Sequence, residues 1–206
     1  MITYEEALSS AHAGNVVFII GAGFSTGAKN NLGEELPTGN SLRNKLAEAT
    51  GIDNSYSLEV IAQQYLDQFG ESQLIQLLKD TFIVSTIPEN YKLLNNLKKA
   101  HFYTTNYDNL LEEIYKSSNK EIKSFQLSTN IKKASKGLFV LHINGKIEQE
   151  TENLDDLRLT LDSYDKSFFS SPWIKYFCDD LRSADAVFIV GYSILADLDL
   201  RRLIAD

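Results

Sequence analysis

The sequence predicts an α/β fold: a Rossmann-like parallel sheet with helices on both faces and a small helical insertion. Three observations support this prediction. Four short apolar runs are rich in β-branched and aromatic residues, as strands buried on both faces are. The segments between these runs repeat apolar residues every three or four positions, which is the helical period. Residues 40–85 carry that period almost without interruption.

The four predicted strands are "VVFII" at 16–20, "HFYTT" at 101–105, "LFVLHI" at 138–143 and "AVFIV" at 186–190. Predicted helices cover 3–11, 40–50, 57–69, 71–82, 90–100 and 107–118. Strands separated by helices need crossover connections, and these produce a parallel sheet covered on both faces. We therefore expect a single domain over 1–206, in which the insertion caps one end of the sheet above a cofactor cleft. Because the chain stops in a helical pattern with no strand after it, we expect it to be the N-terminal part of a longer protein.

The charge and composition exclude several classes of protein. A net charge of -8 opposes a broad phosphate-neutralising surface, so no direct nucleic-acid binding is expected. No apolar run approaches the roughly 20 residues that span a bilayer, and the acidic N-terminus does not resemble a signal peptide, so we predict no membrane contact and a cytoplasmic location. Cys178 is the only cysteine, which excludes an intramolecular disulfide and a cysteine zinc site. We predict no metal, since the acidic runs are typical of solvated helix faces.

The first candidate for chemistry is the turn after the first predicted strand, "VVFIIGAGFSTG" at 16–27. Gly21 and Gly23 allow a backbone to approach a pyrophosphate while the next helix presents free N–H groups. The dinucleotide pattern G-x-G-x-x-G is incomplete, because Thr26 stands where the pattern has its last glycine. The glycine comes one place later, at Gly27. A tight turn without a ligand is the alternative interpretation.

Three further polar positions lie at or beyond the ends of the other predicted strands. Asn106 ends one strand, where open α/β sheets place their ligands, although an Asn there can also close a turn. Asp108 can cap the next helix. His142 and Asn144 are two residues apart and so are expected on one face, and a hydrogen-bonded structural role is the alternative for the histidine.

The fourth stretch, "AVFIVGYSILADLDLRRLI", repeats the arrangement of the first. Gly191 and Ser193 offer backbone N–H groups and a hydroxyl after a strand. Asp197 falls in the first turns of the predicted helix, where a carboxylate suits the helix dipole.

Taken together, "GAGFS", "TTNYD", "LHINGKI" and "VGYSILADLDLRRLI" resemble the sirtuin-like family, and more closely its prokaryotic branch in antiviral defence. "LPTGNSL" at 36–42 stands where that family has its cofactor-loop motif. The resemblance implies a Rossmann-like fold that binds NAD between the sheet and the smaller module. It also implies a role for each matching residue. Gly21, Ala22, Gly23 and Ser25 would hold the pyrophosphate, Asn106 and Asp108 would lie near the nicotinamide ribose, and Gly191, Ser193 and Asp197 would contact the adenosine side.

The resemblance also implies an activity. Protein-deacylating members carry a four-cysteine zinc ribbon, which this chain cannot form, so deacylation is the less favoured activity. The defence branch resembles NAD glycohydrolases, in which Asn106 would orient water or a ribose hydroxyl and His142 would act as the general base. The family histidine usually stands directly before the glycine, a place that Asn144 fills here, so either residue is a candidate for that role.

The resemblance finally implies a setting. We expect an NAD-depleting antiphage effector that is activated by a trigger, by assembly into a homo-oligomer or by a defence-system partner protein. The alternative is a domain that senses NAD or ADP-ribose, or assembles a complex, without effective cleavage.

Overall fold

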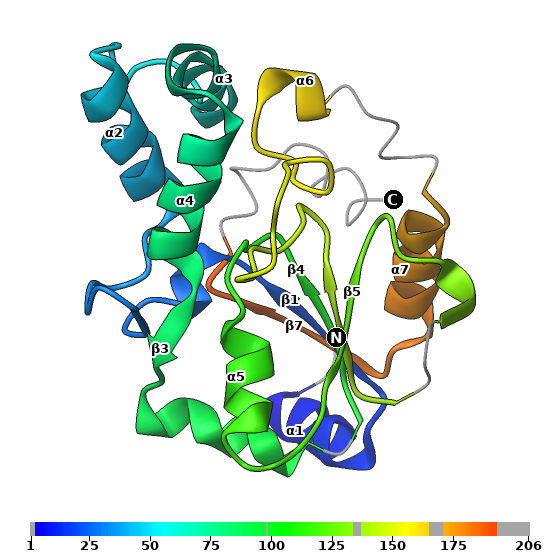
Figure 1. Cartoon of the computed structure of the whole chain (residues 1–206). Helices are drawn as coiled ribbons and strands as arrows, with labels where there is room; N and C mark the ends of the chain where they lie inside the picture. Colours follow the sequence, from blue (N-terminus) through cyan, green and yellow to red (C-terminus); the bar gives the residue numbers. More distant parts are fainter. Residues whose placement is uncertain (1–2, 98, 134–136, 165–170, 193–206) are drawn as a thin grey trace.

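We describe the fold from a computed structural model, in which residues 3–97, 99–133, 137–164 and 171–192 are described. A five-stranded sheet with the order β5-β6-β4-β1-β7 forms its centre (Figure 1). The strands are β1 (Val16–Ile20), β4 (His101–Thr104), β5 (Lys123–Gln126), β6 (Phe139–His142) and β7 (Ala186–Val190). Every neighbouring pair is parallel, which confirms the predicted Rossmann-like α/β class.

The strand register explains how distant sequence motifs meet. Ile20 pairs with both Thr104 and Val190, and Thr104 pairs with His142. Four strands therefore end at one level. The residues that follow them emerge together along the carboxyl edge of the sheet, where parallel α/β sheets bind ligands.

Helices cover both faces of the sheet, as predicted (Figure 1). On one face, α7 (Pro172–Ser183) buries Trp173 and Phe177 against Tyr103 and Leu141. Ser171 caps this helix by accepting the Trp173 N–H, and Pro172 occupies its first turn, where no backbone donor is needed. The opposite face packs against α1 (Tyr4–Ala13), α5 (Leu110–Lys116) and the 3-10 helix η2 (Glu89–Asn96).

Residues 39–82 form three helices, α2 (Gly39–Thr50), α3 (Leu58–Phe69) and α4 (Glu71–Phe82). They lie together on one side of the sheet in Figure 1 and share a core that includes Leu42, Leu46, Ile61, Leu74 and Leu78. The short antiparallel strands β2 (Lys29–Asn30) and β3 (Val84–Thr86) bracket them. This pairing anchors both ends of the helical segment at one place.

Several elements differ from the sequence prediction. The segment expected to be helical at 90–100 is the 3-10 helix η2. The run at 186–190, expected to be buried on both faces, forms β7, the outermost strand of the sheet among the described residues, in which Val187 and Ile189 are each 41% exposed. Strands β2, β3 and β5 and the short elements η1 (Ala22–Phe24), η3 (Ile131–Lys133) and α6 (Leu161–Tyr164) were not predicted. Among the described residues, no helix is long and apolar enough to cross a membrane.

Candidate functional site

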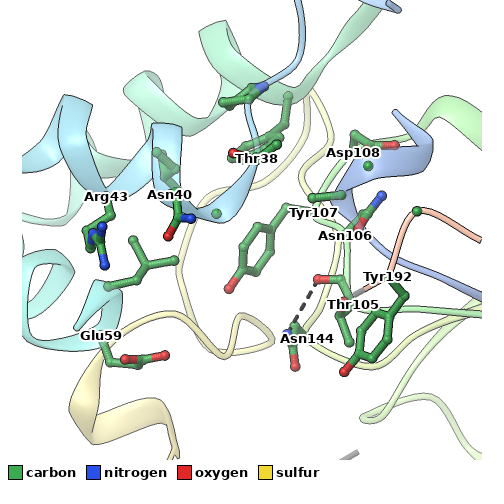
Figure 2. A pocket seen from close by; sticks show the side chains of 18 of the residues that line it. Thr38, Asn40, Arg43, Glu59, Thr105, Asn106, Tyr107, Asp108, Asn144 and Tyr192 are labelled. Atoms are coloured by element: carbon green, nitrogen blue, oxygen red, sulfur yellow. Dashed lines mark hydrogen bonds between the residues drawn. The ribbon is translucent and has the colours of Figure 1, made fainter. Parts of the chain in front are cut away.

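A cavity of about 610 Å³ lies between the carboxyl edge of the sheet and the helical segment (Figure 2). The sheet side of its wall includes Ala22, Gly23, Asn106, Asp108, Asn144 and Gly191. The helical side includes Thr38, Asn40, Arg43, Ser57, Glu59 and Phe82. The cavity therefore collects residues from all four predicted motifs and from the "LPTGNSL" segment.

The glycine turn after β1 uses most of its amides internally. The Gly23 N–H donates to the Gly191 carbonyl at 2.8 Å, and the Gly21 N–H donates to the Val190 carbonyl at 3.0 Å. The chain then forms a single 3-10 turn rather than the expected helix with free N–H groups. From residue 21 to 25, within the described part of the chain, only the Ala22 N–H has no protein acceptor. A bound phosphate at this turn would therefore meet one free amide.

The glycines allow the turns after β1 and β7 to pack directly on each other. Gly191 has φ +62, and a Cβ there would lie 1.9 Å from the Phe24 nitrogen. A Cβ on Gly21 would lie 2.6 Å from the Cα of Tyr192. Only residues without a side chain fit this contact, so a structural requirement fixes these glycines whether or not a ligand is bound.

Asn106 follows β4 by two residues, and its side chain has a fixed orientation. Its Nδ2 donates to the Gly21 carbonyl at 3.2 Å and to the Ser25 hydroxyl at 3.0 Å. Because both amide protons are used, the Oδ1 atom is left as the acceptor that Asn106 can offer to the cavity. The residue is 7% exposed, so this acceptor is held in a largely dry wall.

Ser25 and Asp108 form the layer beneath Asn106. The Ser25 hydroxyl donates to Asp108 Oδ2 at 2.7 Å, and Leu110 N–H donates to the other carboxylate oxygen at 3.1 Å. Asp108 was expected to cap the next helix, but the cap position of α5 is Asn109, and Asp108, one place before that cap, accepts from the first helical residue, Leu110. Ser25, expected at the pyrophosphate, is 2% exposed and does not line the cavity. Burial raises the pKa of Asp108, and the bonds from Ser25 and Leu110 oppose that shift.

His142 lies behind Asn106, away from the cavity wall. Its Nδ1 is 3.1 Å from the Asn106 carbonyl oxygen and its Nε2 is 3.0 Å from Glu112 Oε1. Both partner oxygens are hydrogen-bond acceptors, so both ring nitrogens are engaged within the protein. The residue is 1% exposed and is not among those that line the cavity. The geometry thus places His142 as a buried side chain that holds the Asn106 backbone.

Glu112 on α5 balances the charge of this buried cluster. Its Oε1 accepts from Lys146 Nζ at 3.0 Å and from the Ser124 hydroxyl at 2.6 Å, in addition to His142. Burial alone would raise the pKa of Glu112, but His142, Lys146 and Ser124 outweigh it and hold the pKa far below the ordinary value of 4.5. The carboxylate is therefore ionised, with Lys146 as its cationic partner and His142 beside it.

Asn144 occupies the cavity wall that His142 does not reach. Strand β6 ends at His142, and a turn at 143–144 breaks the alternation that was expected to put both side chains on one face. Figure 2 shows Asn144 beside Thr105, whose carbonyl accepts its Nδ2 at 3.4 Å. Its buried Oδ1 has no partner among the described residues. An unpaired buried acceptor typically costs roughly 1–3 kcal/mol.

The remaining site predictions have different outcomes. Ala22, Gly23 and Gly191 line the cavity, whereas Gly21 contributes only its carbonyl, which accepts from Asn106. Ser193 and Asp197 lie outside the described residues. Arg43 and Glu59, which Figure 2 shows on the helical side of the cavity, were not predicted, because they belong to ordinary helical patterns.

Comparison with known proteins gives the class that this fold and cavity define. Residues 100–206 match the SIR2-like domain family, which is more than half of the chain. The chain therefore belongs to the SIR2-like domain family, as the sequence motifs indicated.

The chain is similar to several bacterial proteins that carry the same name, NAD(+) hydrolase ThsA. The chain is 30% identical over 156 residues to the NAD(+) hydrolase ThsA of Bacillus cereus (strain MSX-D12), an alignment that covers 72% of this chain and 32% of that protein. It is 26% identical over 205 residues to the NAD(+) hydrolase ThsA of Enterococcus faecium, covering 94% of this chain and 40% of that protein. The ThsA of Cytobacillus dafuensis is 26% identical over 158 residues, covering 74% and 31%. The chain thus spans about a third of the length of these relatives.

Proposed function

We propose that this chain is the catalytic domain of an NAD hydrolase, which converts NAD and water to ADP-ribose and nicotinamide in the cavity at the sheet edge. One observation carries the proposal: Asn106 presents a fixed amide oxygen to a cavity that lies where parallel α/β sheets bind nucleotides. Membership of the SIR2-like family and the printed name of the relatives, NAD(+) hydrolase, support it.

The proposed reaction requires little acid or base catalysis by the protein. The bond between the ribose C1′ and the nicotinamide nitrogen breaks, and its electron pair stays on nicotinamide, which leaves as a neutral molecule. A water oxygen then bonds to C1′, and the surplus proton passes to solvent. The protein has to hold the ribose, stabilise the positive charge that develops on it and place the water.

The described residues suit these tasks. Asn106 Oδ1 would orient the attacking water or a ribose hydroxyl, and Asp108 lies beside it near the nicotinamide ribose. Ala22, Gly23 and Gly191 would border the pyrophosphate, and the Ala22 N–H, which has no acceptor among the described residues, would donate to it. The predicted contacts of Ser193 and Asp197 with the adenosine side belong to the same proposal.

The cellular setting is also part of the proposal. We place the activity in the bacterial cytoplasm as the NAD-depleting effector of an antiphage system, activated by a trigger, by a partner or by assembly of the longer protein. This rests on the resemblance to the defence branch of the family and on the share of the relatives' length that the chain leaves uncovered.

A second candidate function is the sensing of NAD or ADP-ribose without cleavage. It is favoured by the place of the histidine: the residue before Gly145 is Asn144, and both ring nitrogens of the nearby His142 are engaged with Asn106 and Glu112 behind the cavity wall. Measurable NAD binding without nicotinamide release, in the full-length protein under activating conditions, would support this candidate.

Replacing Asn106 tests the hydrolase directly. Chromatography of NAD incubated with the wild-type protein should show nicotinamide and ADP-ribose in equal amounts. Asn106→Ala should lower the rate by roughly 100-fold, because the water or ribose loses its fixed partner. The matched control is Asn96→Ala, since Asn96 is exposed and lies outside the cavity. Cleavage by Asn106→Ala at the wild-type rate would refute the proposed function.

A further inference from the structure

Arg43 is the only basic residue among the described residues that line the cavity. The same lining contains two acidic residues, Glu59 and Asp108. Figure 2 shows the Arg43 side chain on the helical side, beside Asn40 and across the cavity from Asn106. The proposed ligand carries a negatively charged diphosphate, and among the described lining residues only Arg43 offers a side chain of the opposite charge.

The guanidinium of Arg43 has no partner within the described part of the chain. Its Nε atom is buried without an acceptor. No ion pair joins it to Glu59, although both residues lie on the helical side of the cavity. A guanidinium has five N–H donors and a permanent positive charge, and arginines removed from water are normally paired. The protein therefore leaves the binding capacity of Arg43 unused at the cavity wall.

Packing of α2, rather than a bond to the guanidinium, keeps Arg43 at this wall. Gly39 and Asn40 lie four and three residues before Arg43, so the three residues share one face of the helix, and all of them line the cavity. The neighbouring face buries Leu42 and Leu46 in the core of the helical segment. This burial fixes the rotation of α2, and the rotation directs Arg43 toward the cavity.

The first turn of α2 adds to the positive potential of the same wall. It contains no acidic residue, and the N–H groups of Gly39 and Asn40 have no acceptor among the described residues. Unpaired N–H groups at a helix N-terminus favour an anion. The glycine turn on the opposite wall has one such amide, at Ala22. Most of the described capacity to bind an anion thus lies on the helical side.

We infer that Arg43 binds a phosphate group of the nucleotide in this cavity and so sets its specificity for phosphorylated ligands. The inference rests on the proposed function and adds a specificity-determining residue to it. Two sources share this chemistry: the diphosphate of NAD and ADP-ribose, and the additional phosphate of their 2′-phosphorylated forms. Arginine suits either source, because its planar fork of donors matches a pair of phosphate oxygens.

Calorimetric titrations with ADP-ribose and with ADP-ribose 2′-phosphate test the inference, because neither ligand contains a nicotinamide that can be released. Arg43→Gln should bind at least one of them roughly 10- to 100-fold more weakly than the wild type, as expected when hydrogen bonds to a charged group are lost. A loss with both ligands assigns Arg43 to the diphosphate. A loss confined to ADP-ribose 2′-phosphate assigns it to the additional phosphate.

The matched control is Lys45→Gln, which removes a positive charge from the same helix. The Lys45 side chain is 43% exposed and is not among the residues that line the cavity, so the affinity should change by less than about 2-fold. Arg43→Gln should unfold at the same urea concentration as the control, because Arg43 has no described partner to lose. A loss of affinity in Arg43→Gln is then not a loss of the fold.

A double variant separates phosphate binding from a balance of charge within the protein. If Arg43 only offsets Glu59, Arg43→Gln combined with Glu59→Gln should bind as tightly as Glu59→Gln alone. We expect the double variant to stay weaker than Glu59→Gln by about 10-fold or more. Full recovery in the double variant would overturn the inference, and so would equal affinities of Arg43→Gln and the wild type for both ligands.

The hydrolase proposal is judged separately, by nicotinamide release from NAD. Release by a wild type whose affinity for both ligands does not depend on Arg43 would refute this inference alone. Binding that depends on Arg43, without nicotinamide release under activating conditions, would refute the hydrolase and support the phosphate site. A wild type that binds neither ligand would refute the inference about Arg43.

Discussion

The amide of Asn106 has its orientation set by residues that are far away in the sequence. The Asn106 side-chain N–H groups donate to the Gly21 carbonyl and the Ser25 hydroxyl in the turn after β1. The backbone carbonyl of Asn106 is bonded to His142 at the end of β6. Three strands of the sheet thus cooperate to leave a single oxygen facing the cavity. The chemistry of the site depends on this side chain being fixed before any ligand arrives.

Gly191 provides a stability test at the scale of one residue. Gly191→Ala should lower the free energy of unfolding by about 3 kcal/mol, because the new Cβ would meet the Phe24 backbone and φ is in the left-handed region. Urea denaturation followed by circular dichroism measures the change. Gly39→Ala is the matched control, since a Cβ there meets nothing within 4 Å. Equal stabilities of the two variants would contradict the packing of the two turns.

At the scale of elements, α5 is joined to β6 and to the residues beyond it by a buried charge cluster. Glu112 on the helix accepts from His142 at the end of β6 and from Lys146, and Lys146 also pairs with Glu148 at 2.6 Å. The side chains of His142 and Lys146 are 1% and 7% exposed, so removing the carboxylate takes a buried partner from His142 and one of two counter-charges from Lys146. Such a loss is costly in a buried setting.

Glu112→Gln should therefore lower the free energy of unfolding at pH 7 by roughly 3 kcal/mol. Glu113→Gln is the control on the same helix. Its partner Lys116 is 76% exposed, so its loss should cost less than about 0.5 kcal/mol. Denaturant titrations of both variants beside the wild type give the two values. A Glu112→Gln protein as stable as the control would show that the cluster contributes nothing.

The carboxylate of Glu112 should also affect how the free energy of unfolding depends on pH in acid. Because its pKa is lower in the folded state than the ordinary 4.5, Glu112 contributes stability that is present above that pH and is lost as pH falls below it. The free energy of unfolding should fall less steeply for Glu112→Gln than for the wild type between about pH 6 and pH 3. Identical slopes would mean that Glu112 has the same pKa in the folded and unfolded chains.

The sequence predicted the elements whose signal is local and missed the contacts that depend on distant pairing. Strands β1, β4, β6 and β7 could be predicted from continuous apolar runs, and α4 from its helical period. Strand β5 was missed because Lys123–Gln126 contains one buried apolar residue, Phe125. The place of His142 could not be predicted because it depends on Glu112, which lies on another element and is 30 residues away.

At the scale of the whole molecule, the cavity exists because the helical segment between β2 and β3 faces the carboxyl edge of the sheet. The motifs predicted the sheet side of the wall, including Ala22, Asn106 and Gly191. The helical side, with Arg43 and Glu59, depends on how α2 and α3 pack. Local patterns do not determine that packing.

The measurement that tests this account most directly is a crystal structure of the chain with ADP-ribose bound. We expect the ligand to fill the cavity with its diphosphate beside Ala22 and Gly23, and with a ribose hydroxyl or an ordered water at the Asn106 amide oxygen. His142 should keep its bonds to Asn106 and Glu112. A ligand bound elsewhere, or a ribose and water that leave the Asn106 amide oxygen without a contact, would contradict the account.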